Sequence, residues 1–66
     1  MINDPVDEEY YTIKEVAALL KVVYLTVYRW VQAGKIVTYK VQKQYRIKKT
    51  DLNKFLNDNK YGKSHD

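Results

Sequence analysis

The sequence predicts a small, mainly α-helical domain with one β-hairpin, in the order helix, short turn, helix, hairpin, helix. Three observations support this prediction. Apolar residues recur with helical spacing in two neighbouring segments between residues 13 and 33. After Gly34, polar and apolar residues alternate on both sides of a polar pair, which is typical of two hairpin strands. The last apolar cluster, at residues 52–56, returns to helical spacing.

The first helix is predicted at residues 13–20. Thr12 can cap its amino end, and Glu15, three residues later, completes a capping box. Spacings of three and four residues place the apolar side chains on one face, which contains Ile13, Val16, Ala17 and Leu20.

The second helix is predicted at residues 24–33, after a short turn at residues 21–23. Gly34 would end it, because glycine accepts the left-handed conformation that commonly follows a helix. We expect one apolar face to pack on the first helix, with Val23, Val27, Trp30 and Val31 on it.

Two alternating runs, at residues 37–41 and 44–47, predict the hairpin, with Gln42 and Lys43 between them. Two-residue hairpin turns favour Gly or Asn, so we expect a strained turn or a longer loop. We expect an inner face with Tyr39, Val41, Tyr45 and Ile47, and an outer face with Lys40 and Arg46.

Thr50 is the predicted cap of a last helix, and Asp51 suits its first turn because a negative charge complements the helix dipole. Its apolar face would carry Leu52, Phe55 and Leu56, and the helix would fade at residues 57–60. The domain would thus cover residues 10–58, between a flexible acidic leader at residues 1–9 and a disordered tail at residues 59–66.

Charge and composition favour a polyanionic partner over an enzymatic role. The formal net charge is +4, and residues 35–49 contain six Lys or Arg and no acid. A basic small domain most often binds nucleic acid. With no cysteine, a lone His65 and no glycine-rich phosphate loop, we expect no disulfide, metal, cofactor or catalytic centre. The acidic start and short apolar runs predict no signal peptide and no membrane span, hence a cytoplasmic, nucleoid-associated protein.

Four sequence pieces, in order, are similar to a known family. They are T-x-K-E-V-A-x-L-L at residues 12–20, T-V-Y-R-W-x-x-x-G-K at 26–35, Y-R-I at 45–47 and D-L-x-x-F-L at 51–56. Together they resemble the excisionase-like branch of the mercury-resistance-regulator (MerR) superfamily. The resemblance covers residues 11–56.

The resemblance implies a winged helix-turn-helix. Its second helix would enter the major groove of double-stranded DNA, and its hairpin, the wing, would lie on the backbone or in the minor groove. Members include phage excisionases, small transcription regulators, and plasmid-maintenance or packaging factors, and several bind repeated DNA sites cooperatively, side by side. Because no long helix follows Leu56, we do not expect a coiled-coil dimer.

Three departures from the family pattern stand out. Val23 replaces the usual Ser or Thr before the second helix, so the capping hydrogen bond would be missing. Gln42 stands where the wing turn usually has Gly. Tyr24 and Leu25 occupy positions that are often basic, which leaves phosphate contacts there in question.

The candidate DNA-binding residues form two groups. The start of a recognition helix contacts base edges, which selects Tyr24, Thr26, Tyr28 and Arg29. Arg29 would contact guanine, contact phosphate or remain a solvated surface charge, whereas Trp30 is expected in the core. On the wing and its flanks the candidates are Lys35, Lys40, Lys43, Gln44 and Arg46.

A second class of function also fits. A protein-interaction module could use the same surface to bind a recombinase, a repressor or a polymerase subunit. The acidic leader and the Tyr24–Leu25 pair favour it.

Overall fold

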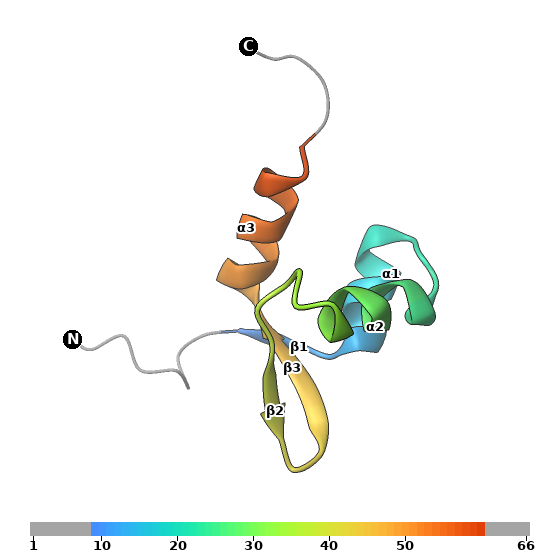
Figure 1. Ribbon diagram of the computed structural model, residues 1–66, viewed down its shortest axis with the longest axis vertical. Helices are drawn as coiled ribbons and strands as arrows, with labels where there is room; N and C mark the ends of the chain where they lie inside the picture. Colours follow the sequence, from blue (N-terminus) through green and yellow to red (C-terminus); the bar gives the residue numbers. More distant parts are fainter. Residues whose placement is uncertain (1–8, 61–66) are drawn as a thin grey trace, which may run out of the picture.

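The computed structural model describes residues 9–60, which form three helices and a three-stranded antiparallel sheet (Figure 1). Residues 1–8 and 61–66 lie outside the described part, so it does not test the predictions of a flexible leader, a disordered tail and no role for His65. The elements are β1 (Tyr10–Tyr11), α1 (Ile13–Leu20), α2 (Tyr24–Gln32), β2 (Tyr39–Val41), β3 (Gln44–Lys48) and α3 (Lys49–Asp58).

Helix α1 begins and ends as its local sequence dictates. The capping box is present: the Glu15 backbone N–H donates to Thr12 Oγ1 at 3.0 Å, and the Thr12 N–H donates to Glu15 Oε1 at 2.8 Å. At the other end Lys21 takes the left-handed conformation, with φ 58°, and the Val22 N–H donates to the Ala17 carbonyl at 3.0 Å. These bonds satisfy backbone groups that the helix leaves unpaired, and the chain turns directly into α2.

Helix α2 ends in the manner predicted for Gly34. Gly34 has φ 72°, its N–H donates to the Val31 carbonyl at 3.1 Å, and the Lys35 N–H donates to the Trp30 carbonyl at 2.9 Å. This pair of bonds is a Schellman motif, which requires a residue with positive φ at the glycine position. At the amino end Val23 makes no side-chain capping bond, as predicted.

The three strands pair in the order β1–β3–β2. The sequence analysis did not identify β1, which is only two residues long, and it placed the start of β2 two residues too early, at Val37. Strand β1 aligns Tyr11 with Ile47, and β2 aligns Lys40 with Tyr45. Strand β3 is therefore the central strand of the sheet.

The predicted face assignment of the hairpin was wrong. Tyr39 lies opposite Arg46, and Val41 lies opposite Gln44, so these four side chains share the outer face. Directly opposed residues of an antiparallel pair point to the same side of the sheet. Consequently Tyr39 and Val41 are 43% and 55% exposed, and only Ile47 of the expected inner face is fully buried.

The hairpin turn is the strained two-residue turn that the sequence suggested. Gln42 has φ 49° and Lys43 has φ 68°, although neither residue is Gly or Asn. This conformation costs an ordinary L-residue about 1–2 kcal/mol, and it matches the twist of the two strands.

We therefore expect Gln42→Gly to raise the free energy of unfolding by about 1 kcal/mol, because glycine adopts positive φ without strain. Urea denaturation measures the change. Gly34→Ala is the matched control and should lower stability by a similar amount, since an added Cβ meets no atom within 4 Å and only its φ of 72° is unfavourable. An unchanged midpoint in Gln42→Gly would contradict a strained turn.

The predicted cap of the last helix was also wrong. Helix α3 begins at Lys49, one residue after the end of β3, and Thr50 lies inside it. The Lys49 N–H donates to the Glu9 carbonyl at 2.9 Å, so backbone next to β1 satisfies the first amide of the helix. The predicted ending is confirmed, because α3 ends at Asp58.

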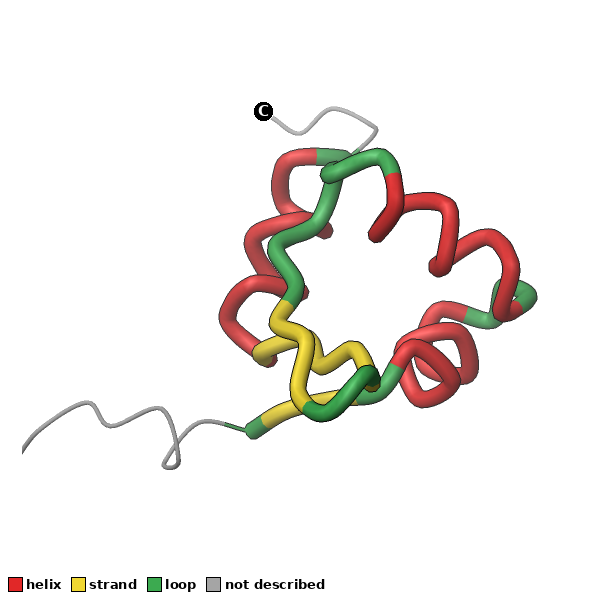
Figure 2. Tube along the Cα trace, turned by 60° about the horizontal axis from the view of Figure 1, so that its bottom comes forward, coloured by secondary structure: helices red, strands yellow, loops and turns green. Residues whose placement is uncertain are grey.

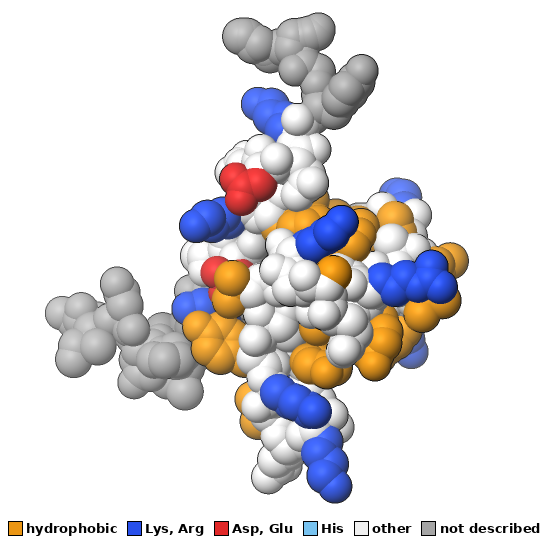
Figure 3. Space-filling view, in the orientation of Figure 1, with side chains coloured by type: hydrophobic (Ala, Val, Ile, Leu, Met, Phe, Trp, Pro, Cys, Tyr) orange, Lys and Arg blue, Asp and Glu red, His pale blue; other side chains and the backbone are white. Residues whose placement is uncertain are grey.

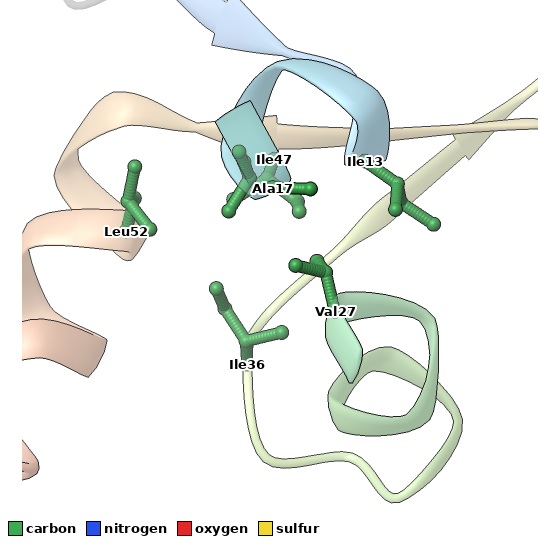
Figure 4. Packing of buried hydrophobic residues seen from close by; sticks show 7 residues of the cluster. Ile13, Ala17, Val27, Ile36, Ile47 and Leu52 are labelled. Carbon is green, nitrogen blue, oxygen red and sulfur yellow. The ribbon is translucent and has the colours of Figure 1, made fainter. Parts of the chain in front are cut away.

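One hydrophobic core joins the three helices and the sheet. Figure 2 shows these elements arranged around a common centre, and Figure 4 shows that apolar side chains point into it from α1, α2, α3, β3 and the segment before β2. Trp30 packs against Phe55 with ring centroids 4.9 Å apart, as part of the rim of this core. Fully or nearly fully buried are Ile13, Val16, Ala17, Val27, Ile36, Ile47 and Leu52.

Two core assignments change. Val23, which we expected to pack on α1, is 68% exposed, because it precedes the first turn of α2 rather than lying within it. Ile36, which the sequence analysis did not single out, is 4% exposed. It lies in the segment leading to β2, and its side chain belongs to the core. With two helices joined by a tight turn and followed by a hairpin, the architecture is a winged helix-turn-helix; the hairpin at residues 39–48 is its wing.

Candidate nucleic-acid interface

Helix α2 presents a continuous exposed face opposite the buried Val27. The positions follow one another at spacings of one, three and four residues, as one side of a helix requires. They are Tyr24, Leu25, Tyr28, Arg29 and Gln32.

This face differs in part from the predicted set. Tyr24, Tyr28 and Arg29 lie on it, whereas Thr26 is half-buried at its edge. Leu25 and Gln32 were not predicted as site residues, although both lie on the side of α2 away from Val27. A helical projection centred on that residue would have found them from the sequence.

Three tyrosine rings connect α2 to the wing. Tyr24 and Tyr28 stack with centroids 6.4 Å apart and an interplanar angle of 15°. Tyr28 meets Tyr45 of β3 edge-on, also at 6.4 Å. The side chain of Gln32 donates a hydrogen bond from Nε2 to the Tyr45 hydroxyl at 3.0 Å. Helix α2 and the wing are thus held together by aromatic contacts and one polar contact.

A groove of about 480 Å³ lies between the start of α1, the start of α2 and the wing. Three tyrosines line it, and basic residues line it from α1 and from the wing. It brings together five of the predicted site residues, Tyr24, Tyr28, Lys43, Gln44 and Arg46, with Thr12, Ile13, Lys14 and Tyr45.

The cations of the wing point in different directions. Lys43 is exposed at the turn, and Lys40 lies over the Tyr45 ring with its Nζ 5.5 Å from the centroid. The Arg46 guanidinium donates to the Tyr45 carbonyl at 3.0 Å and to Gln44 Oε1 at 2.7 Å. Because Lys40 pairs with Tyr45, and Arg46 with Tyr39, the two cations leave opposite faces of the wing. The prediction that they share one face was wrong.

Two predicted flanking positions stand apart from the groove. Lys35 follows α2 at an exposed position and does not line the groove, nor does Lys40.

On the outer face of the sheet, Lys48 places its Nζ 5.4 Å from the centroid of Tyr39, which also meets Tyr10 edge-on at 6.3 Å. The hydrogen-bonding interaction with the Tyr39 side chain raises the pKa of Lys48 above its ordinary value.

The described part of the chain is more basic than the whole. Residues 9–60 contain eleven Lys or Arg and four Asp or Glu, a formal net charge of +7. One acid is paired with a base, Glu9 with Lys49 at 3.8 Å, on the edge of the sheet away from the groove. Lys and Arg side chains cover the lower end of the wing, and hydrophobic side chains gather between the wing and α2 (Figure 3). The wing, which contains Lys40, Lys43, Arg46 and Lys48 and no acid, is therefore a surface that attracts a polyanion.

The contribution of a side-chain cap to stability can be tested at the amino end of α2. Val23→Ser should raise the free energy of unfolding by about 1 kcal/mol, because its hydroxyl supplies the capping bond that Val23 lacks. Thermal unfolding should show a rise of roughly 4–8 °C. Thr12→Ala, which removes an existing cap, should lower stability by a similar amount. A serine variant that melts no higher than the parent would contradict this account of the helix start.

Residues 9–60 contain neither a cluster of metal-binding side chains nor a membrane-spanning helix. No group of three or more His, Cys, Asp or Glu side chains lies close enough there to hold a metal ion. None of the helices in this range has the length and apolar character needed to cross a membrane.

Comparison with known proteins agrees with this geometry. Residues 10–60 match the family described as helix-turn-helix domain. The chain is 47% identical over 45 residues to the uncharacterized protein YvgK of Bacillus subtilis (strain 168); the match covers 68% of this chain and 15% of that protein. No solved structure gives a significant match. Because the family match covers most of the chain, including both helices of the motif and the wing, the protein belongs to the family of DNA-binding helix-turn-helix domains.

Proposed function

We propose that this domain binds double-stranded DNA sequence-specifically, with α2 in the major groove and the wing on the adjacent backbone or in the minor groove. The observation that carries the proposal is the single surface on which the exposed face of α2, the tyrosine-walled groove and the wing cations meet. An α-helix with its side chains is about 10–12 Å across, and the major groove is about 12 Å wide.

Each element of this surface has a distinct role in the proposal. Arg29 lies where a guanidinium can donate two hydrogen bonds to guanine, or one to phosphate. Lys43 and Arg46 supply positive charge from the wing, and Tyr24 and Tyr28, which line the groove, supply hydroxyl groups that can donate to phosphate. Thr26, Lys35 and Lys40 are peripheral contacts in this arrangement, because none of them lines the groove or lies on the exposed face of α2.

The biological setting we propose is that of a small excisionase or architectural factor, a transcription regulator or a plasmid-maintenance factor. The four family-like sequence pieces support this range, and family members that bind repeated sites cooperatively support binding side by side on DNA repeats. The chain spans a small part of the relative it matches, at 15% of its length, so a larger protein can contain such a domain.

The direct test measures fluorescence anisotropy on a mixed duplex library at several salt concentrations, followed by sequencing of the retained duplexes. We expect affinity to fall steeply with salt, with a slope of about 0.9 for each phosphate contact, and the retained pool to converge on a short sequence. Absence of binding at low salt would overturn the proposal. Binding without convergence would overturn its sequence-specific part.

A second function is favoured by a specific observation, the exposed apolar residues at the start of α2. Val23, Tyr24 and Leu25 are 68%, 54% and 49% exposed, which is the pattern of a protein contact such as a recombinase, a repressor or a polymerase subunit. If a protein is the target, substituting Tyr24 should break that complex and leave DNA affinity unchanged. If DNA is the target, the same substitution should weaken DNA binding.

A further inference from the structure

Leu25 occupies the centre of the surface that the proposed function places in the major groove. It lies two residues before Val27, which is fully buried, and thus on nearly the opposite side of the helix. Its side chain is 49% exposed, with Tyr24 on one flank and Arg29 one turn further along α2. A large apolar side chain there contributes to no part of the core.

The hydrogen-bonding groups on the centre of this face are confined to the later turns of α2. Arg29 and Gln32 follow Leu25 by four and seven residues, so they lie one and two turns beyond it. The first turn contains neither an acidic side chain nor a capping side-chain bond. At the centre of this face, the side chain that can contact a base edge is therefore apolar at the amino end of α2, where Leu25 lies. Further along the helix, the corresponding side chains are polar, Arg29 and Gln32.

Only one apolar group is presented by the bases in the major groove, and this is the C5 methyl of thymine. We infer that Leu25 makes α2 a reader of thymine methyl groups, so that the preferred DNA has an A·T pair with its thymine methyl facing Leu25. The neighbouring pair would offer guanine or adenine acceptors to Arg29 or Gln32. This inference rests on the proposed function and specifies its substrate class.

Charge complementarity supports DNA rather than an apolar protein as the occupant of this face. Leu25 is flanked by Arg29 on α2, and Lys43 and Arg46 face the same groove as Tyr24 and Tyr28. With eleven bases against four acids in residues 9–60, a polyanion gains from approaching here. Burying the methyl against Leu25 adds discrimination that long-range attraction does not provide.

The experiment replaces each thymine of the library-selected duplex with uracil, one at a time, which removes the methyl and keeps the base pair. We expect one replacement, at the thymine facing Leu25, to weaken binding about fourfold, the effect of leaving one methyl-sized group unburied. In Leu25→Ala the same replacement should have no effect. Leu19→Ala is the matched control, since Leu19 is 55% exposed on α1 and should leave the uracil effect unchanged.

The outcomes separate this inference from the proposed function. A uracil effect that persists in Leu25→Ala, or no uracil effect in the parent protein, would overturn the inference and leave DNA binding intact. Failure of the parent to bind any duplex would overturn the proposed function itself. Circular dichroism checks that Leu25→Ala folds, and we expect an unchanged spectrum because the side chain lies outside the core.

Discussion

Ile47→Ala should lower the free energy of unfolding by about 3 kcal/mol, within the range of about 2–5 kcal/mol for removing a large aliphatic side chain from a core. Ile47 is fully buried in the central strand, and it belongs to a core cluster to which all three helices contribute side chains. A chain of this length has a total stability of roughly 3–10 kcal/mol. Urea denaturation should show a large loss or a chain unfolded without denaturant.

Two further variants test the reason for this loss. Ile47→Val removes one methylene and should cost about 0.5–1.5 kcal/mol. Leu19→Ala removes an aliphatic side chain of the same composition from a position that is 55% exposed, and should change stability by about 0.5 kcal/mol or less. If Ile47→Ala and Leu19→Ala had equal effects, β3 would not be the centre of the core.

The double variant Arg29→Ala/Lys43→Ala should reduce affinity for the selected duplex about 100-fold near physiological salt. An arginine–base contact contributes about 1–3 kcal/mol of discrimination, and each lost phosphate contact lowers the salt slope by about 0.9. Anisotropy titrations at several salt concentrations measure both quantities. Both side chains are exposed, so the fold should be retained.

A charge-matched control separates contact from net charge. Lys54→Ala/Lys60→Ala removes the same two charges from α3 and the segment after it, which extend away from the wing tip in Figure 1. Its effect should be much smaller, because exposed charges more than about 8–10 Å from the DNA are largely screened. Equal losses in the two double variants would show that general attraction, and not contact by α2 and the wing, governs binding.

Local signals in the sequence were sufficient to predict the helices. The Thr12–Glu15 capping box and the Gly34 terminus are interactions between residues close in the chain, and both are confirmed. The start of α3 was predicted at Thr50 for the same kind of reason, and it was wrong because a distant residue intervenes. The Glu9 carbonyl, in the residue before β1, accepts from the Lys49 N–H and so satisfies the first amide of the helix.

The wrong face assignment in the hairpin follows from the strand register that a two-residue turn imposes. With a two-residue turn, Val41 pairs with Gln44 and Tyr39 with Arg46, so the two alternating patterns cannot have their apolar residues on one face. The sequence analysis considered the alternating segments 37–41 and 44–47 separately, so it did not detect that their apolar residues lie on different faces. Three consequences were missed together: the exposure of Tyr39, the separation of Lys40 from Arg46, and the need for another core residue, which Ile36 supplies.

Five of the residues that the sequence selected for the interface lie around one groove, whereas the contacts that join their elements could not be predicted. The helix and wing residues Tyr24, Tyr28, Lys43, Gln44 and Arg46 do line one groove. The contacts that join α2 to the wing connect residues 17 and 13 positions apart in the chain, Tyr28 with Tyr45 and Gln32 with Tyr45. Periodicity within one segment contains no information about such contacts.

Because Tyr45 is fixed to both Tyr28 and Gln32, the spacing between α2 and the wing is set before any duplex arrives. The domain therefore presents α2 and the wing at a preset spacing. In the proposed complex, a duplex whose backbone separation matches that spacing would bind without deformation, whereas another would have to bend or change its groove width at a cost that depends on its stiffness. Base pairs that no side chain touches then contribute to the choice of site through their mechanics.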